Sequence, residues 1–264
     1  MTTVTTADFP WPSDLDPNTV CFTVDVEWAA GEVLSDLRSL FDQYGVRATF
    51  FVTHAGVEAP GHERGLHPNF RRDGDTYKQL RKPSESELSD EEIYNRIVST
   101  TLAFAPEAKG LRSHSLYYDS ILLPLYRRFG LEYDCSYQMP LVGGLRPFWK
   151  HHDIVEIPTY YADHFDILTG ATGFELTALQ LDRPGLKVFD FHPNVIFINA
   201  HSEAQYQVTK SFYHDPVRLL AARHTGKGAR SLLIDLLATV KERGLPTATV
   251  GEVNARWRAT AKWK

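Results

Sequence analysis

The sequence predicts a parallel α/β domain, either a barrel or an open sheet, on three observations. Residues 20–53 hold a strand, an amphipathic helix and a second strand in that order, and a strand–helix–strand unit favours parallel pairing. Short β-branched or aromatic runs then alternate with helical patterns along the chain. Near the C-terminus, residues 229–243 (ARSLLIDLLATVKER) form an amphipathic helix closed by Gly244, and the strand PTATV follows.

The first elements are the clearest. VCFTVDV, which starts at Val20, is the kind of run that forms a buried strand. Residues 31–44 (GEVLSDLRSLFDQY) space their apolar side chains at helical intervals and stop at Gly45, and RATFFVT at 47–53 is a second strand. Residues 55–87 are polar and rich in Gly and Pro, which predicts a long loop. A loop of this length in a compact domain is more often functional than merely tolerated.

Helices and strands alternate after this loop. Ser89 begins a helix that runs towards Pro106, and Glu92 completes its capping box. GLRSHSL follows as a strand end, and a helix over 119–129 is expected to kink at Pro124. Further strands are predicted at LEYDCSY, IVEIPTY, KVFDF and VIFINA.

Length and composition narrow the class of protein. The chain has 264 residues, of which 43% are hydrophobic, and 28 Lys and Arg face 33 Asp and Glu. The resulting charge of −5 argues against nucleic-acid binding, which needs a clustered basic face. No apolar run is long enough for a transmembrane segment, and two cysteines are too few for a disulfide framework. Residues 1–19 lack a secretory signal and have little apolar surface to bury, so we expect a loose arm, a single domain at 20–264 and a cytoplasmic location.

Two acidic residues end the first strand. In TVDVEW, Asp25 and Glu27 are two residues apart, so their side chains point to the same side of an extended chain. Carboxylates at the C-terminal mouth of a parallel strand lie where α/β enzymes place catalytic groups. Neither acid has a basic neighbour in the segment, and an unpaired carboxylate beside a core strand needs a partner such as a metal ion. The alternative is a solvated strand end.

Three further segments carry candidate side chains. His67 and His62 lie in one Gly/Pro-flanked loop that could present an imidazole to zinc or a similar ion. Arg112 could orient a carboxylate through its guanidinium. His192 ends an aromatic strand, where an imidazole can act as a general acid or base. The alternatives are hydrogen-bonded structural histidines and a surface salt bridge.

The order of these segments resembles the polysaccharide deacetylases, the NodB-homology enzymes of carbohydrate esterase family four. TVDVEW resembles the family's first motif, RATFFV its second strand, GLHPNF its histidine motif and GLRSHSLYYD its arginine motif. EIPTYYAD stands where the fourth motif is expected, FDFHP resembles the late histidine motif, and GLPTATVGEV resembles the strand that ends the barrel. The resemblance covers residues 20–253 and implies a distorted (β/α)7 barrel.

The resemblance also implies an activity and its residues. The reaction would be the metal-dependent removal of an N- or O-acetyl group from a sugar, with zinc the expected divalent ion. Asp25 matches the family's catalytic base, His192 its general acid, and Arg112 the arginine that orients the base. Glu27 matches the metal carboxylate, and His67 matches the first histidine of the metal-binding HxxxH motif.

The chain departs from the family pattern around the metal. Arg71 stands four residues after His67, where the family has its second metal histidine. Glu27 lies two residues after Asp25 instead of next to it, and His114 stands where the family normally has Pro.

The missing metal ligand has three explanations: His114 supplies it, Asn69 supplies it, or the metal is lost. His62 is a weaker substitute, because the matching family position is usually not a ligand. We favour His114, because imidazole binds zinc better than an amide oxygen does. Arg112 and His114 are two residues apart, so in an extended chain both would enter the same cleft.

The expected substrate is a precursor of surface polysaccharide in nucleotide-linked, lipid-linked or oligosaccharide form. Asn69, Tyr160 and Tyr161 are candidate substrate-binding residues, although aromatic residues at such spacing are more often core. Two other functions stay open. The missing HxxxH partner leaves room for a sugar-binding protein that has lost catalysis, and the family also includes amidases that act on non-sugar C–N bonds.

Overall fold

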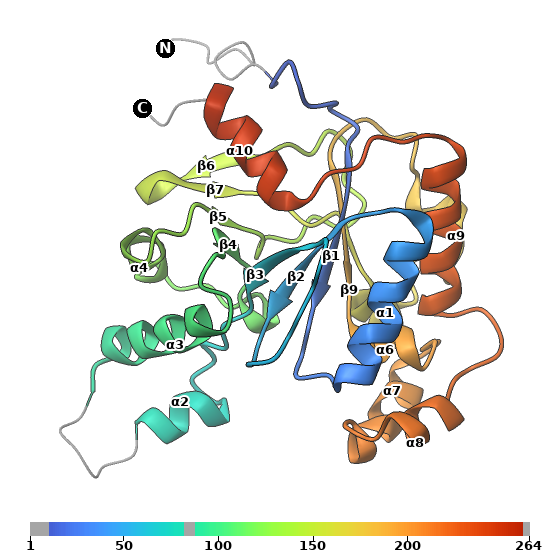
Figure 1. The fold of residues 1–264 in the computed structure, drawn as a ribbon, viewed down its shortest axis with the longest axis horizontal. Coiled ribbons are helices and arrows are strands. Elements are labelled where there is room, and N and C mark those ends of the chain that lie inside the picture. Colours follow the sequence, from blue (N-terminus) through green and yellow to red (C-terminus); the bar gives the residue numbers. More distant parts are fainter. Residues whose placement is uncertain (1–10, 82–87, 261–264) are drawn as a thin grey trace.

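The computed structural model describes residues 11–81 and 88–260, and within these ranges nine strands form one curled sheet (Figure 1). The strand order is β6-β7-β5-β4-β3-β2-β1-β9-β8, and β6 with β7 is the antiparallel pair in an otherwise parallel sheet. This curled α/β sheet with surrounding helices confirms the distorted barrel. The strands span Val20–Asp25 (β1), Ala48–Val52 (β2), Glu63–Leu66 (β3), Gly110–Leu111 (β4), Tyr133–Asp134 (β5), Phe148–Lys150 (β6), Ile154–Glu156 (β7), Tyr161–Ala162 (β8) and Lys187–Phe191 (β9).

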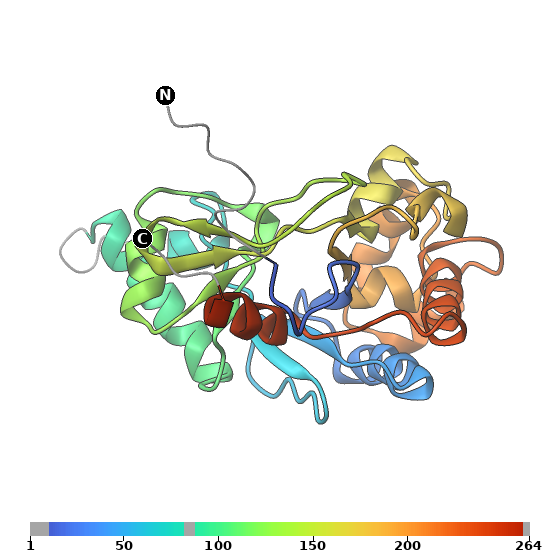
Figure 2. The same ribbon diagram turned by 90° about the horizontal axis from the view of Figure 1, so that it is seen from above.

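Helices flank the sheet in two groups. Seen from above, α2 to α4 lie on one side of the strands, and α1 with α5 to α9 lies on the other (Figure 2). α10 lies across the end of the sheet from which β1 and β2 start, opposite their arrowheads (Figure 1). The helices span Gly31–Tyr44 (α1), Asp75–Leu80 (α2), Asp90–Phe104 (α3), Leu122–Arg128 (α4), Asp163–Thr169 (α5), Pro193–Phe197 (α6), Glu203–Thr209 (α7), Pro216–Ala221 (α8), Ala229–Glu242 (α9) and Val250–Thr260 (α10).

The core forms around β1, all six residues of which are buried. Phe22 packs edge-on against Phe41 of α1, with ring centroids 5.7 Å apart. α1 buries Val33, Leu37, Leu40 and Phe41, and each such side chain contributes about 1.5–3 kcal/mol through burial. Gly45 ends the helix at φ 70°, a left-handed conformation that glycine adopts without strain.

Parallel pairing brings the carboxyl ends of β1, β3, β4 and β9 to one edge of the sheet. Val24 is in register with Phe191 of β9, and Leu66 of β3 is in register with Leu111 of β4. The residues that come directly after these four strands therefore share one rim, where α/β proteins place their functional groups.

Two predicted elements differ from the structure. Residues 55–87 are not one long loop, because they contain β3 and α2. In β3, a Cβ on Gly65 would lie 2.6 Å from the Phe51 ring, so this strand fits against β2 because it carries no side chain there. The predicted strand VIFINA is instead the end of α6 and the turn after it, because Pro193 opens a helix directly after β9.

Three smaller differences concern the end of the barrel, Pro124 and the arm. PTATV does not form a strand: it pairs with β1 through a single Val20–Thr247 bridge and then enters α10. Pro124 is the third residue of α4, in the first turn, where its missing N–H costs no helical bond, so the helix contains it without a kink. Residues 1–10 of the predicted arm lie outside the described residues, while Leu15 is 3% exposed. No helix in the described part of the chain is long and apolar enough to cross a bilayer.

Candidate active site

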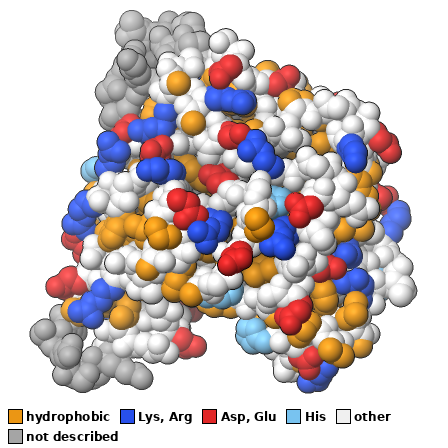
Figure 3. Space-filling view, viewed as in Figure 1, with side chains coloured by type: hydrophobic (Ala, Val, Ile, Leu, Met, Phe, Trp, Pro, Cys, Tyr) orange, Lys and Arg blue, Asp and Glu red, His pale blue; other side chains and the backbone are white. Residues whose placement is uncertain are grey.

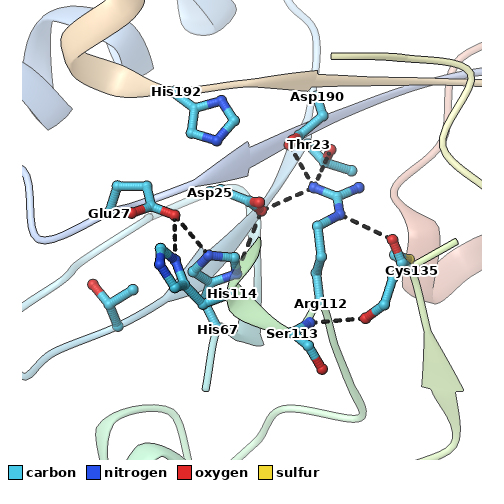
Figure 4. Close-up of polar contacts among 12 residues, drawn as sticks. Thr23, Asp25, Glu27, His67, Arg112, Ser113, His114, Cys135, Asp190 and His192 are labelled. Atoms are coloured by element: carbon cyan, nitrogen blue, oxygen red, sulfur yellow. Dashed lines mark hydrogen bonds and ion pairs between the residues drawn. The ribbon is translucent and has the colours of Figure 1, made fainter. Parts of the chain in front are cut away.

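The chain bends sharply after β1. Glu27 and Trp28 have φ of 49° and 55°, a left-handed conformation that costs free energy in residues other than glycine. Two hydrogen bonds hold this bend: Trp28 N–H donates to Thr53 Oγ1 at 3.0 Å, and the Tyr213 hydroxyl donates to the Glu27 carbonyl at 2.8 Å. The bend aims the Glu27 carboxylate at two histidines (Figure 4).

Both of these histidines contact the same carboxylate oxygen. His67 Nε2 lies 2.9 Å from Glu27 Oε1, and His114 Nδ1 lies 2.8 Å from it (Figure 4). His67 follows β3 and donates its backbone N–H to the Val52 carbonyl, whereas His114 follows β4. The His67 side chain is fully buried, while Glu27 and His114 keep 16% and 20% of their side chains exposed. The cluster therefore has a buried back and an open front.

The charges of this cluster reinforce one another. Burial acts to raise the pKa of Glu27, but the hydrogen bonds from His114 and His67 outweigh it and hold the pKa well below its ordinary value. Burial acts to lower the pKa of His67, but the nearby Asp25 carboxylate and the hydrogen bond to Glu27 raise it overall. Two imidazoles thus face an ionised carboxylate.

The donor set fits a divalent ion. The ligand atoms of Glu27, His67 and His114 lie within 4.8 Å of one another, and two imidazoles with one carboxylate are a set that zinc accepts. His67 Nδ1 is buried without a hydrogen-bond partner among the described residues and lies 3.7 Å from Asp25 Oδ1. Asp25, Glu27 and His192 form a second group of this kind, but Asp25 is already paired with Arg112.

Arg112 is a fully buried cation that joins Asp25 to Asp190. Its Nη1 donates to Asp25 Oδ1 at 2.9 Å, to Thr23 Oγ1 at 2.9 Å and to Asp190 Oδ1 (Figure 4). Its Nε donates to the Cys135 carbonyl at 3.0 Å, and its guanidinium carbon lies 4.7 Å from the Phe51 ring centroid. These contacts hold the guanidinium in one place and orient the Asp25 carboxylate.

The two carboxylates beside Arg112 differ in their pKa. Burial acts to raise the pKa of Asp25, but Arg112 and then His67 outweigh it, so the pKa lies below its ordinary value. Burial raises the pKa of Asp190 to about 7, because the Arg112 charge only partly offsets the desolvation. Asp25 is thus the ionised member of the pair at neutral pH, as a proton acceptor must be.

His192 is held by Asp163. The His192 backbone N–H donates to Asp163 Oδ2 at 2.8 Å, and His192 Nδ1 lies 2.7 Å from Asp163 Oδ1. Burial acts to lower the pKa of His192, but the buried Asp163 carboxylate outweighs it and raises the pKa to about 10. Because Nδ1 is taken by Asp163, Nε2 is the nitrogen left for the cleft, and it carries a proton at neutral pH.

The site opens into a cleft with a volume of about 770 Å³. Asp25, Glu27, His114 and His192 line its floor. In the space-filling view the lower edge of the molecule is notched, with histidine side chains at the notch, and acidic and basic side chains are interspersed over this face (Figure 3). The other lining residues are Trp28, Arg71, Ser115, Leu116, Gln138, Ala162, His164, Phe165, Leu168, Asp190, Tyr206, Lys210, Tyr213 and His214.

The structure brings six of the nine predicted site residues together and places three elsewhere. Asp25, Glu27, His67, Arg112, His114 and His192 form the contacts described above. Asn69 does not line the cleft, because its Oδ1 accepts the Arg71 backbone N–H at 3.1 Å in the turn after β3. Tyr160 and Tyr161 are 1% and 4% exposed and pack in the core, where their hydroxyls donate to the Leu179 carbonyl and to Asp166.

Two residues of the candidate site were missed by the sequence reasoning. Asp190 lies inside KVFDF, where an acid between aromatic residues of a buried strand is itself a sign of a buried partner. Asp163 ends the segment EIPTYYAD, and its place directly after a strand is the available signal. Neither signal says which cation or imidazole the carboxylate meets.

Comparisons with known proteins agree with this geometry. A family model described as WbmS-like polysaccharide deacetylase matches residues 22–210. A solved structure from Bordetella bronchiseptica, described as a candidate polysaccharide deacetylase involved in O-antigen biosynthesis, is 30% identical, with a match over 88% of this chain and 97% of that one and a TM-score of 0.71. A candidate polysaccharide deacetylase from Mycobacterium smegmatis is 18% identical over 95% of this chain and 93% of that one, and its TM-score of 0.60 shows the same fold. No curated protein matches the sequence.

Proposed function

The chain belongs to the WbmS-like family of polysaccharide deacetylases, and we propose that it is a metal-dependent hydrolase that removes an acetyl group from a sugar precursor of surface polysaccharide. One observation carries this proposal: the imidazoles of His67 and His114 both lie within hydrogen-bonding distance of Glu27 Oε1. Asp25 and His192 line the same cleft. The Bordetella relative, described as involved in O-antigen biosynthesis, supports a surface polysaccharide as the destination of the product.

Glu27, His67 and His114 would hold the ion. A divalent ion there, with zinc the expected one, supplies a Lewis acid that polarises the acetyl carbonyl and lowers the pKa of water. The fully buried His67 side chain anchors one side, while the partly exposed Glu27 and His114 leave the cleft side open for substrate. Three protein ligands with one open position are typical of catalytic zinc sites.

Asp25 and His192 move the protons. Asp25 accepts a proton from the attacking water, because Arg112 and His67 keep its carboxylate ionised. The water oxygen adds to the acetyl carbon, and the bond from this carbon to the sugar nitrogen or oxygen breaks. His192 gives its Nε2 proton to the leaving atom, because Asp163 keeps the ring protonated at neutral pH. Acetic acid, which ionises to acetate on release, and a free amine or hydroxyl are the products, and the proton taken by Asp25 balances the one given by His192.

This proposal is favoured over a sugar-binding protein that has lost catalysis. A binding protein has no use for a proton acceptor, a proton donor and a three-ligand cluster around one cleft. The buried Asp25–Arg112 and His192–Asp163 pairs are costly to desolvate, and such perturbed groups are a sign of catalysis when they meet in a cleft.

Metal analysis combined with acetate release tests the proposal. Purified protein is expected to bind about one zinc ion per chain and to release acetate from an N-acetylated sugar. Asp25→Asn should abolish turnover but keep the metal, whereas Glu27→Gln should weaken metal binding itself, since Asp25 acts on the proton and Glu27 on the ion. Protein that takes up no zinc on titration, or that releases acetate only from non-sugar acetamides, would contradict the assignment.

A further inference from the structure

One wall of the active-site cleft differs in charge from the floor. It is built from α5, α7 and the segment after α7, and it carries no carboxylate among the described residues that line the cleft. The carboxylates that do line the cleft come from β1, the bend after it and β9, and each contacts a buried arginine or imidazole: Asp25, Glu27 and Asp190. The polar and aromatic side chains of the wall are His164, Tyr206, Lys210, Tyr213 and His214.

Lys210 is the cation of this wall. Its side chain is exposed, and its ammonium lies 5.2 Å from the centroid of the Tyr206 ring. No Asp or Glu among the described residues pairs with it. Arg71, which also lines the cleft, is by contrast paired with Asp73 at 2.6 Å. In a chain with a net charge of −5, Lys210 is therefore an uncompensated positive charge inside the cleft.

Contacts between rings connect Lys210 to the proposed acid. The rings of His192 and His164 have centroids 5.4 Å apart, and those of His164 and Tyr206 have centroids 5.9 Å apart. The Tyr206 ring is also the one that the Lys210 ammonium contacts. A substrate that receives a proton from His192 therefore lies beside a wall that carries Lys210.

His164 adds a neutral hydrogen-bond donor to this wall. Burial and then the charge of His192 lower the pKa of His164, so its ring offers one N–H at neutral pH. The Tyr213 hydroxyl is not such a donor, because it already donates to the Glu27 carbonyl. Lys210 and His164 contact the same Tyr206 ring, so an ammonium and an imidazole N–H are available to one group of a ligand.

We propose that Lys210 and His164 bind an anionic group on the sugar that loses its acetyl group. The substrate class is then an acidic N-acetyl sugar, an inference that rests on the proposed deacetylase function. The anion is a carboxylate, as in a uronic acid, or a phosphate ester, as in a sugar phosphate. A lysine ammonium binds either of them as a compact point charge.

A neutral sugar fits this wall less well. It would displace water from the Lys210 ammonium without supplying an opposite charge, which costs free energy. An anion there meets no opposing carboxylate on the wall, because the acids of the cleft lie on its floor and are paired with buried groups.

Acetate release from size-matched sugars tests this subsite. N-acetylglucosaminuronic acid is compared with its neutral uronamide, and N-acetylglucosamine 1-phosphate with the neutral methyl glycoside of N-acetylglucosamine. In at least one pair, kcat/KM should be about tenfold higher for the anionic sugar, because an ammonium and an anion attract strongly in a partly desolvated cleft. A preference within the first pair alone identifies a carboxylate, and one within the second pair alone identifies a phosphate ester.

Variants of Lys210 assign the preference to this side chain. Lys210→Met keeps an apolar stem but removes the charge, so it should abolish most of the preference for the anionic sugar, whereas Lys210→Arg should retain it. Lys241→Met is the matched control: this ammonium also lies near a tyrosine ring, 5.8 Å from the centroid of Tyr44, but outside the cleft on α9. It should leave the preference unchanged.

Calorimetric binding of the same sugars to the Asp25→Asn variant separates the subsite from the reaction. Tighter binding of an anionic sugar that weakens about tenfold on adding Lys210→Met supports the subsite even if no sugar is deacetylated, which would count against the proposed function alone. Equal kcat/KM within both pairs overturns the subsite and leaves the deacetylase intact. The subsite is also overturned if no anionic sugar binds, or if the preference survives Lys210→Met, because the anion then binds elsewhere in the cleft.

Discussion

Replacing Arg112 by methionine should destabilise the protein by about 3–5 kcal/mol, because it leaves buried carboxylates without their cation. The guanidinium is fully buried and binds both Asp25 and Asp190, whose side chains are 6% and 5% exposed. Methionine is shorter than arginine, but it is unbranched and apolar, so it fills the space of the arginine stem while the charge and the hydrogen bonds are removed. The loss therefore reports the ionic contacts together with a smaller packing contribution.

Adding Asp190→Asn to the Arg112→Met variant should restore part of the lost free energy of unfolding. One carboxylate then remains beside the missing cation instead of two, and directly coupled residues commonly interact by about 0.5–3 kcal/mol. Asp190→Asn alone should be mild, at about 1 kcal/mol, because the amide oxygen still accepts from Arg112 and from Thr23.

Urea unfolding followed by circular dichroism gives the three free energies of unfolding and that of a control. Arg243→Met removes an exposed arginine that pairs with Asp182, and it should cost no more than about 1 kcal/mol. The reasoning is refuted if Arg112→Met costs no more than this control, or if Asp190→Asn destabilises the Arg112→Met background as much as it does the wild type.

Three further predictions concern the metal, the acid and a buried carboxyl group. His114→Ala should reduce zinc affinity by more than the roughly 10–100-fold typical of outer-shell residues, whereas Asn69→Ala should leave it unchanged. Equal zinc content of the two variants by mass spectrometry would rule out His114 as a ligand. Because Asp163 raises the pKa of His192 to about 10, Asp163→Asn should move the alkaline fall in kcat to lower pH, and an unmoved pH–rate profile would exclude His192 as the acid. Burial raises the pKa of Glu156 from 4.5 to about 8, so between these pH values the folded state binds a proton that the unfolded state does not. The free energy of unfolding therefore falls as the pH rises from 4.5 to 8, and Glu156→Gln should flatten this fall in urea titrations at several pH values.

Local patterns predicted the elements whose signal lies in a single segment. The run beginning at Val20, the helical spacing of 31–44 and the capping box of Ser89 each produced the expected element, because propensity, burial and end signals agree there. β3 was missed because ERGL has two charged residues and a glycine. Its stability comes from partners distant in sequence, such as the Tyr133 hydroxyl that donates to Glu63.

The candidate site divides in the same way. Asp25, Arg112 and His192 could be proposed from strand ends, since one edge of a parallel sheet gathers the residues at the carboxyl ends of its strands. The roles of Asp163 and Asp190 could not be predicted, because the role of a buried acid depends on the charged group that it contacts. The fold, and not the local sequence, determines that these groups are His192 and Arg112. Tyr160 and Tyr161 were the converse case: aromatic residues beside a motif look like a sugar platform, but on β8 and just before it they fill the core.

Glu27 and His114 belong to one rearrangement of the proposed metal site. β1 ends at Asp25, and the left-handed bend after it places Glu27 beyond the end of the strand. The two imidazoles follow β3 and β4, which lie two and three strands away from β1 in the sheet, so the Glu27 carboxylate must extend back towards them. The extra methylene of glutamate lengthens that reach. Because the second imidazole comes from the segment after β4, the residue at position 71 does not have to be a metal ligand. Arg71 lines the cleft and pairs with Asp73. A motif defined by fixed spacing misses this exchange, since a metal requires donors that meet in space and not at set intervals along the chain.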